Sequence, residues 1–397
     1  MLLTRRSFLA SSAAVATAVP THAAAGLYRS DPARTGCPLT SGLPHLTGAK
    51  WSYKLGGRQH CTPALADGLL VSGLNVYQNL YALDAETGKP RWEFRTGNVA
   101  SPPTIANGMV YAGSGDVREL DRGLFLAIDL KTGQERWRLT TGRIESKSPL
   151  AVDDLVYLAS DNLNLYALDA QSGREAWKFH FALPHYMVIG HTAPAYADGT
   201  IYFGGSGMKL DGTTTYAALF ALDARTGALK WQFAPRGRAN VRSDDRLQDM
   251  VAVAGGVVYG KSDNFLFAVD ASTGRQRWIF RAPRAITVPA VTAGRAYVGC
   301  FDGTVYVLDS ASGAIVDRIP LAGYCDTAPV IAGDIVYLAL GANGTQHESW
   351  LTAIDLRSKE PLWRFQPESS KGWSFVSPLV TDGRIYAGAY TGMYCLA

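Results

Sequence analysis

Residues 80–92 read LYALDAETGKPRW, in which a strand of alternating apolar positions is followed by a polar turn and a second strand. The Thr87-Gly88 pair predicts the turn, and Trp92 closes the segment. The frame recurs along the chain, and in each copy an Asp precedes the Trp position by eight residues. A fixed internal period predicts a repeat architecture. The other copies are LFLAIDLKTGQERW at 124–137, LYALDAQSGREAW at 165–177, LFALDARTGALKW at 219–231, LFAVDASTGRQRW at 266–278, VYVLDSASGAIVD at 305–317, with Asp317 in the Trp position, and LTAIDLRSKEPLW at 351–363.

Four short strand signals occupy each period. The first opens with a proline, as in Thr62-Pro63-Ala64-Leu65. Proline lacks the amide donor, so it belongs at a strand start or a sheet edge. A dipeptide such as Asp67-Gly68 then predicts a two-residue hairpin into the second strand. The LYALD strand is the third and the Trp strand is the fourth. Four antiparallel strands repeated radially predict a β-propeller.

The two ends of the chain decide the number of blades. Seven units with the repeat Asp precede a last unit that starts at Ser377-Pro378 and stops after its third strand. Residues 51–55, WSYKL, match the Trp strand but have no third strand before them. We therefore predict an all-β, eight-bladed β-propeller of four-stranded antiparallel blades, in which the N-terminal strand completes the last blade and closes the ring. The alternative has seven blades, with the fifth unit, which lacks the proline, as an insertion.

Residues 1–25 have the pattern of an export signal. A basic start is followed by an Ala-rich apolar run, too short to span a membrane, and by an Ala-rich cleavage region at 23–25. The stretch TRRSFL at 4–9 resembles the twin-arginine motif, and a general secretory signal is the alternative. Cys37 lies too far downstream for lipid attachment. We expect a signal peptide at 1–25, an N-terminal extension at 26–50 and the propeller at 51–397, in an exported, periplasmic or extracellular protein without a transmembrane segment.

The composition is that of a globular protein, with 47% apolar and 18% charged residues. The formal net charge of +4 falls to +2 without Arg5 and Arg6, which gives no reason to expect a nucleic-acid partner. We expect a monomer. Export permits disulfides, although the sequence does not pair the cysteines, and their scatter favours buried free thiols over a metal or redox site. The five cysteines are Cys37, Cys61, Cys300, Cys325 and Cys395.

The LxALDAxTGxxxW unit resembles the PQQ-type propeller repeat, named for quinoprotein dehydrogenases. The resemblance covers residues 51–397 and implies the propeller fold, but this scaffold hosts both enzymes and binding proteins. Quinoprotein alcohol dehydrogenases are longer, carry adjacent cysteines against the cofactor and place acidic and amide ligands around calcium. No Cys-Cys pair or metal-ligand spacing occurs in this sequence. The cofactor therefore stays open: no specific motif supports PQQ, and no metal site is expected.

The repeated residues have a structural interpretation, in which Asp and Thr bond turn amides, Gly permits the turn and Trp fills the wedge between blades. Because strand directions alternate, the short first-to-second and third-to-fourth turns share one face. The second-to-third connections and the links between blades share the other. Variable loops on a rigid scaffold usually carry function, so we place the site on this second face, around the mouth of the central channel. Nearly all irregular segments belong to it: 114–123, 205–215, 235–249 and 341–349.

Two tryptophans lie off the repeat, Trp350 after the 341–349 segment and Trp373 in the link to the last blade. They could form an aromatic platform for a ring, a sugar or a peptide, or lie beneath a long loop as ordinary core residues. Polar residues near the starts of the innermost strands could hold an anionic ligand or support acid–base chemistry, although each alone also fits a hydrated channel lining. These residues are His60, Glu145, Lys147, His185, His191, Asp249, Tyr324 and Asp326, with Arg58, Arg143 and Lys371 nearby.

Three functions fit this sequence. The first, which we favour, is binding of a small ligand or a protein partner on the loop-rich face. It is similar to the role of the propeller subunit of the outer-membrane β-barrel assembly machinery, whose lipid-attachment cysteine is missing here. The second is a PQQ-dependent oxidoreductase. The third is a cofactor-free exported enzyme whose catalytic groups are rim residues such as His185 or Asp249. No motif names the ligand or a reaction type.

Overall fold

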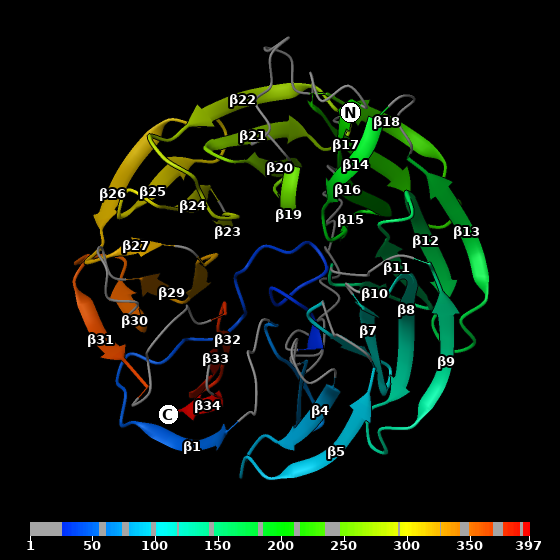
Figure 1. The fold of residues 1–397 in the computed structure, drawn as a ribbon. Helices are drawn as coiled ribbons and strands as arrows, with labels where there is room; N and C mark the ends of the chain where they lie inside the picture. Colours follow the sequence, from blue (N-terminus) through cyan, green and yellow to red (C-terminus); the bar gives the residue numbers. More distant parts are fainter. Residues whose placement is uncertain are drawn as a thin grey trace, which may run out of the picture.

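A computed structural model shows a ring of eight antiparallel β-sheets around a central channel (Figure 1). It describes residues 26–54, 61–73, 79–96, 101–116, 119–142, 147–181, 186–209, 215–234, 247–292, 294–325, 327–341, 349–367, 376–389 and 392–397. Each sheet is one blade, with its first strand at the channel and its last strand at the rim. The predicted eight-bladed propeller is confirmed, and the fifth unit forms a blade of its own.

The first four blades follow the chain in order. Blade 1 contains β2 (Ala64–Ala66), β3 (Leu69–Gly73), β4 (Asn79–Asp84) and β5 (Pro90–Arg95). Blade 2 contains β6 (Thr104–Ala106), β7 (Met109–Asp116), β8 (Glu119–Asp129) and β9 (Glu135–Thr140). Blade 3 contains β10 (Leu150–Val152), β11 (Leu155–Ala159), β12 (Asn164–Asp169) and β13 (Glu175–His180). Blade 4 contains β14 (Tyr186–His191), β15 (Ala195–Ala197), β16 (Thr200–Lys209), β17 (Thr215–Asp223) and β18 (Leu229–Phe233).

The other four blades complete the ring. Blade 5 contains β19 (Leu247–Ala254), β20 (Val257–Ser262), β21 (Phe265–Asp270) and β22 (Gln276–Arg281). Blade 6 contains β23 (Ala290–Thr292), β24 (Arg295–Cys300), β25 (Thr304–Asp309) and β26 (Ile315–Pro320). Blade 7 contains β27 (Tyr324–Cys325), β28 (Val330–Ala332), β29 (Ile335–Gly341), β30 (Ser349–Asp355) and β31 (Pro361–Phe365). Blade 8 contains β32 (Leu379–Thr381), β33 (Arg384–Ala389), β34 (Gly392–Leu396) and β1 (Ala49–Lys54).

Blade 8 joins the two ends of the chain. Its three C-terminal strands are completed by β1, in which Trp51 pairs with Cys395 and Tyr53 pairs with Met393. The predicted closure by the N-terminal strand is therefore confirmed. It hydrogen-bonds the edge of β34, which would otherwise stay open for pairing with another chain.

The turn between the third and fourth strands is built by the repeat Asp. In blade 1, one Asp84 oxygen accepts bonds from the Thr87 amide and hydroxyl, both at 2.8 Å, and Arg91 donates to the other oxygen at 2.6 Å. These bonds, that from Arg91 most of all, lower the pKa of Asp84 to about 2. Gly88 follows at a φ of 70°, a left-handed conformation that favours glycine. The structural interpretation of the repeat Asp, Thr and Gly is confirmed.

Neighbouring blades are joined by a repeated contact, which we call the Trp seam. In the seam between blades 2 and 3, Trp137 Nε1 donates to the Ala170 carbonyl at 3.1 Å, and the Tyr111 hydroxyl donates to the same oxygen at 3.0 Å. A Cβ on Gly173 would lie 2.6 Å from the Trp137 ring, so the glycine lets the ring settle on the turn. The bond from Nε1 to a turn carbonyl measures 2.7–3.1 Å at six junctions, from Trp51, Trp92, Trp137, Trp177, Trp231 and Trp278.

Two junctions differ from the Trp seam. Between blades 6 and 7, Asp317 stands in the Trp position and Lys359 stands in the Gly position of the facing turn, and Lys359 Nζ lies 2.6 Å from Asp317 Oδ1. An ion pair has therefore replaced both members of the seam together. Between blades 7 and 8, Trp363 Nε1 donates at 2.8 Å to the Leu43 carbonyl of the N-terminal extension.

Residues 26–48, which we call the N-terminal plug, enter one end of the channel and then run outward to β1 at the rim (blue in Figure 1). The innermost strand of each blade turns an open edge to the channel, and its amides and carbonyls need partners. Plug carbonyls accept the amides of four successive blades. These bonds are Tyr196 N to Pro32 O at 2.8 Å, Val253 N to Ala33 O at 2.8 Å, Val291 N to Thr35 O at 2.9 Å and Ile331 N to Gly36 O at 3.0 Å.

Arg34 extends this pairing to carbonyl groups. Its side chain is fully buried, and its guanidinium donates to Pro194 O at 3.1 Å, Pro149 O at 2.7 Å and Tyr28 O at 2.7 Å. Burial lowers the pKa of Arg34 to about 10, so the group stays charged at neutral pH. The plug is thus bonded to the propeller by its backbone and by a buried side chain.

The cysteines are free, and all but Cys37 are fully buried. Burial raises the pKa of Cys61 to about 12 and that of Cys37 to about 11. Free, buried thiols agree with the interpretation drawn from their scatter in the sequence. In the part of the chain that the structure describes, no helix is long and apolar enough to cross a membrane.

Candidate functional site

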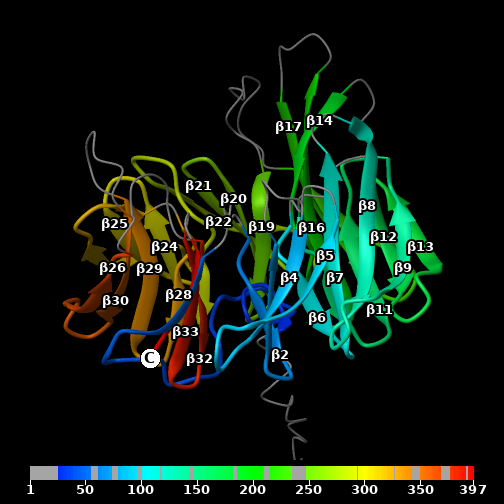
Figure 2. The ribbon, with the colours of Figure 1, turned by 60° about the horizontal axis from the view of Figure 1, so that its bottom comes forward.

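Two of the predicted insertions form β-hairpins that extend beyond their blades. In blade 2, β7 and β8 pair as far as Asp116 and Glu119, and in blade 4, β16 and β17 pair as far as Met208 and Thr215. β14 adds a further strand alongside β16. Figure 2 shows these hairpins standing above the ring on the same side. Both hairpins stand on one face, as expected. The described parts of these two insertions are regular, however, because the strand pairing continues into them.

The plug occupies the opposite end of the channel. It bonds the middle residues of β15, β23 and β28, each directly before the regular turn that ends the strand. Ser41 O lies 2.9 Å from the position of a Cβ on Gly333, which belongs to the first turn of blade 7. The plug therefore lies on the face of regular turns, opposite the extended hairpins.

Tyr28 lies at the inner end of the plug. Its half-buried ring packs against Ala193, Val288 and Ala328, which directly precede the prolines of blades 4, 6 and 7. The Arg34 guanidinium lies 5.5 Å from the centre of the Tyr28 ring. An aromatic ring thus packs inside an apolar collar that three blades form.

Buried charges lie beneath this collar. Arg29 Nη2 donates to Pro289 O at 2.6 Å and to Thr35 O at 3.3 Å. The Asp31 carboxylate accepts bonds from the Thr35 amide, at 3.0 Å, and from the Thr35 hydroxyl. Burial raises the pKa of Asp31 despite the two nearby arginines. Two guanidiniums against one carboxylate make this end of the channel electropositive.

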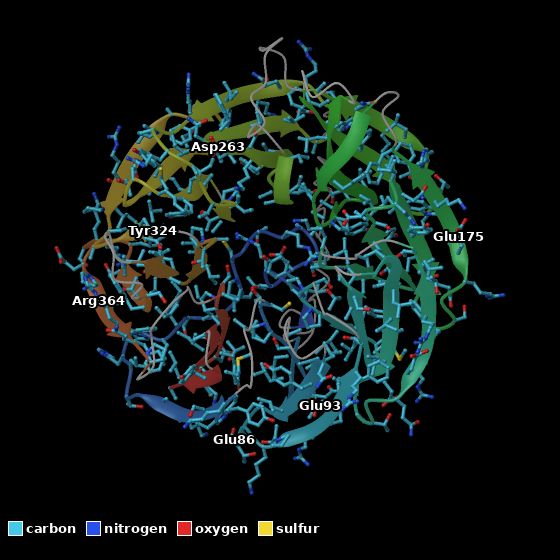
Figure 3. The ribbon with its side chains drawn as sticks, in the orientation of Figure 1. Glu86, Glu93, Glu175, Asp263, Tyr324 and Arg364 are labelled. Atoms are coloured by element: carbon cyan, nitrogen blue, oxygen red, sulfur yellow. The ribbon has the colours of Figure 1, made fainter. Side chains whose placement is uncertain are left out.

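Tyr324 joins two blades on the hairpin face. It lies in β27 and pairs with Gly341, the last residue of β29. Its ring stacks on Phe301 of blade 6, with 5.7 Å between the ring centres and 18° between the planes. Phe301 is 40% exposed, so the stacked pair offers apolar surface to solvent. Figure 3 labels Tyr324 in the same sector of the ring as Arg364 of β31.

Trp350 lies next to this pair, in β30 opposite Leu340. Its half-buried ring packs against a buried cluster that includes Cys325 and Leu338. The Arg364 guanidinium lies 5.6 Å from the centre of the ring. Trp350 Nε1 is buried and has no hydrogen-bond partner among the described residues. The ring therefore has a core role in blade 7, and its role in ligand binding stays a prediction.

Three further predicted site residues lie within the described ranges. Lys147 is half-buried directly before Ser148-Pro149, where the innermost strand of blade 3 begins. His191 lies in β14, opposite Gly205 of β16, on the added strand of blade 4. Asp249 lies in β19, the innermost strand of blade 5. These positions are at the channel side of three successive blades, so the prediction that they belong to one face is consistent with the topology.

The remaining predicted site residues lie outside the described residues, and their part in a site stays a prediction. They are Arg58, His60, Arg143, Glu145, His185, Asp326, Lys371 and Trp373.

Sequence patterns did not predict the buried contacts of Tyr28, Arg29 and Arg34 with the propeller, or the exposed ring of Phe301. The N-terminal extension has no internal repeat, and no sequence pattern in it predicts a buried arginine. Phe301 stands in an Asp-Gly hairpin, as Phe301-Asp302-Gly303, and a bulky apolar residue in such a short exposed turn was a usable signal. Its partner Tyr324 belongs to another blade, and only the fold brings the two together.

Among the described residues, no three His, Cys, Asp or Glu side chains are grouped so that they could hold a metal ion. Lowered carboxylate pKa values belong to repeat turns such as Asp84 and Asp270, where arginine and threonine donate to the carboxylate. Those turns lie on the regular face, away from the channel mouth, so their perturbed titration reflects turn structure.

A protein-family model matches almost the whole propeller. It is described as outer membrane protein assembly factor BamB and matches residues 45–122, 117–243 and 211–396. The chain belongs to the PQQ-like β-propeller family. The resemblance drawn from the LxALDAxTGxxxW unit is thereby confirmed at the level of the family.

Curated relatives of this PQQ-like propeller have different functions. It is 30% identical to the serine/threonine-protein kinase AfsK of Streptomyces griseus over 315 residues, which is 77% of this chain and 36% of the kinase. It is 27% identical to BamB of Yersinia pestis, over 55% of each chain. It is 24% identical to the dehydrogenase subunit of a quinone alcohol dehydrogenase of Komagataeibacter europaeus, over 58% of this chain and 34% of that one. The matches thus span from about a third to just over half of the relatives' lengths.

Solved structures show the same fold at low identity. BamB from Moraxella catarrhalis superimposes with a TM-score of 0.66 at 18% identity, covering 88% of this propeller and 98% of that chain. A europium-containing methanol dehydrogenase superimposes with a TM-score of 0.71 at 15% identity, covering 93% and 90%. BamB and a methanol dehydrogenase match about equally well, so the fold alone does not decide the function.

Proposed function

We propose that this PQQ-like propeller is an exported binding protein that holds a protein partner on its hairpin face, at the mouth of the channel. The observation that carries the proposal is the asymmetry of the channel. The plug occupies the end with regular turns, and the β7–β8 and β16–β17 hairpins, two blades apart, stand above the opposite face.

Three further features support a protein partner. The stacked pair of Phe301 and Tyr324 gives exposed aromatic surface. Aromatic residues are enriched among those that contribute most to binding at protein interfaces. The matching family model and several relatives carry the name of an outer membrane assembly factor. The signal pattern at 1–25 favours export to the same compartment, by the twin-arginine route.

Site-specific photo-crosslinking tests the proposed face. A photoreactive residue at Met208, in the blade 4 hairpin, should crosslink a protein in intact cells. The same residue at Asp67 or Asp198, exposed in regular turns on the other face, is the matched control. A defined adduct from Met208 that is missing from both controls supports the proposal. Equal crosslinking from both faces, or from the regular turns alone, contradicts it.

Once the crosslinked partner is identified by mass spectrometry, Trp373→Ala should weaken its affinity about tenfold or more, as expected for an aromatic anchor. Leu362→Ala is the control, because Leu362 is exposed on the rim strand β31. Isothermal calorimetry gives both affinities, and circular dichroism checks that each variant is folded. Unchanged affinity in Trp373→Ala removes this residue from the site.

A quinoprotein oxidoreductase is the second candidate, favoured by the alignment with the quinone alcohol dehydrogenase and the superposition on a methanol dehydrogenase. The described residues do not fit it, because they provide no group of three metal-ligating side chains. The absorbance spectrum and native mass spectrum of the purified protein separate the candidates. A bound quinone with calcium or a lanthanide, and dye-linked alcohol oxidation after reconstitution, would replace the binding function with this one.

A further inference from the structure

The junction between blades 6 and 7 is held by a different interaction from the Trp seam. At a Trp seam, an indole rests on a turn glycine, and its Nε1 donates to the carbonyl one residue after the repeat Asp of the next blade. The corresponding carbonyl in blade 7 belongs to Leu356. Among the described residues, neither Asp317 nor any tyrosine donates to it.

The replacement at this junction is an exposed ion pair. The side chains of Lys359 and Asp317 are 37% and 40% exposed. Lys359 also keeps the left-handed φ, 66°, that glycine has in the equivalent turns. Exposed ion pairs contribute little to stability and are screened by salt, whereas the hydrogen bond of an uncharged, at least half-buried indole is much less sensitive to salt. The contact at this position is therefore weaker, and more dependent on salt, than the Trp seam at the six other junctions, although blades 6 and 7 also share a buried apolar cluster.

Blade 7 also lacks a Trp seam on its other side. There Trp363 Nε1 donates to Leu43 O, and the Leu43 amide donates to the Tyr337 hydroxyl, so the plug takes the place of the turn of blade 8. At the position of the Trp seam, blade 7 is thus held on one side by an ion pair and on the other by the plug, in addition to the apolar packing that it shares with both neighbours. It carries Tyr324 and Trp350, which lie on the hairpin face.

We propose that the Asp317–Lys359 pair is an ionic latch at the edge of this junction, whose release lets blade 7 shift relative to blade 6. Release breaks one exposed ion pair and separates Phe301 on blade 6 from Tyr324 on blade 7. The buried apolar cluster that the two blades share keeps the ring closed during this shift. That this motion adapts the hairpin face to a partner rests on the proposed function, whereas the latch itself does not.

Hydrogen exchange measured by mass spectrometry tests the latch on the full-length folded protein. Peptides covering 315–320 and 355–361 report on this junction, and peptides covering 135–140 and 169–175 report on the matched Trp seam between blades 2 and 3. We expect faster exchange at the latch, with a further increase of up to about fivefold on going from low to about 1 M salt. Exchange at the matched seam should not depend on salt.

Three variants distinguish a latch from general looseness of blade 7. Asp317→Asn, which keeps the shape but removes the charge, should give the high-salt exchange rates already at low salt. The charge swap D317K/K359D should restore slower exchange, and D317W/K359G should install a Trp seam, slow exchange further and abolish its salt dependence. Exchange at the latch that equals the matched seam, or that does not respond to salt or to Asp317→Asn, overturns the proposal.

A binding measurement separates the latch from the proposed function. If the crosslink from Met208 is present, D317W/K359G should change its yield while the Leu362→Ala control does not. If no partner is captured at all, the proposed function fails, but the exchange result still decides whether the latch exists. A latch seen by exchange with an unchanged crosslink yield would refute the link to binding.

Discussion

Replacement of Arg34 by methionine tests whether the plug is an integral part of the propeller. The change removes a fully buried guanidinium and keeps an unbranched apolar chain of similar length. It leaves Pro194 O and Tyr28 O without the donors that Arg34 supplies at 3.1 and 2.7 Å. Pro149 O keeps a partner, because the Thr104 hydroxyl donates to it at 2.8 Å.

The expected loss follows from these contacts. A buried acceptor left unpaired costs about 1–3 kcal/mol, so two of them cost about 2–6 kcal/mol. Removing a buried charge offsets part of this cost, because burial opposes the charged form of Arg34 and lowers its pKa. We therefore expect Arg34→Met to lower the free energy of unfolding by about 2–4 kcal/mol.

Urea denaturation followed by tryptophan fluorescence measures this loss, and limited proteolysis shows whether residues 26–48 become accessible. Arg225→Met is the matched control, because Arg225 is 59% exposed and pairs with Asp153 and Asp154 on the surface. The control should change stability by less than about 1 kcal/mol. If Arg34→Met unfolds like the control and its N-terminus stays resistant to protease, the plug does not depend on Arg34 and the reasoning is wrong.

Three further predictions concern the repeat and the thiols. Gly173→Ala should destabilise the protein by about 2–4 kcal/mol in urea denaturation, because the new Cβ lies 2.6 Å from the Trp137 ring at a left-handed φ of 69°. Asp84→Asn should flatten the loss of stability in acid: bonds from Arg91 and Thr87 lower the folded pKa of Asp84 to about 2, so its stabilisation is present above the unfolded pKa of about 4 and is lost as the pH falls toward 2. Cys61 should resist a thiol reagent at pH 8 until the protein unfolds, because it is 1% exposed and burial raises its pKa to about 12; rapid labelling of the folded protein would contradict its placement.

The turn built by the repeat Asp shows why so much of the fold was predictable. Asp84, Thr87 and Gly88 act within one turn, so their roles follow from spacing and local chemistry. The count of eight blades follows because each unit repeats the same pattern of strands and turns, and because the strand of Trp51 has no third strand before it. The fold of such a chain can be predicted from its sequence because local conformational preference and global fold agree.

The candidate site was less predictable, because its residues meet across blades. Tyr324 stacks on Phe301, 23 positions earlier in another sheet, and that distance in sequence has no fixed relation to distance in space. The exception at Asp317 was visible, but its explanation needed Lys359 of the next blade. Such pairs depend on how two sheets are set against each other, which no single repeat unit specifies.

The sequence by itself determined the architecture of this protein: the repeat, the four-stranded blades, the closure of the ring by the N-terminal strand and the face that carries the insertions. The tertiary structure alone decided that the first part of the plug enters the channel, that Arg34 is buried against carbonyls of blades 3 and 4, and that an ion pair replaces the Trp seam at one junction. The physical reason is the range of the interactions. Turns and strands are set by neighbours in sequence, whereas the channel exists only after eight blades have closed, and its unpaired backbone groups then select the segment that fills it.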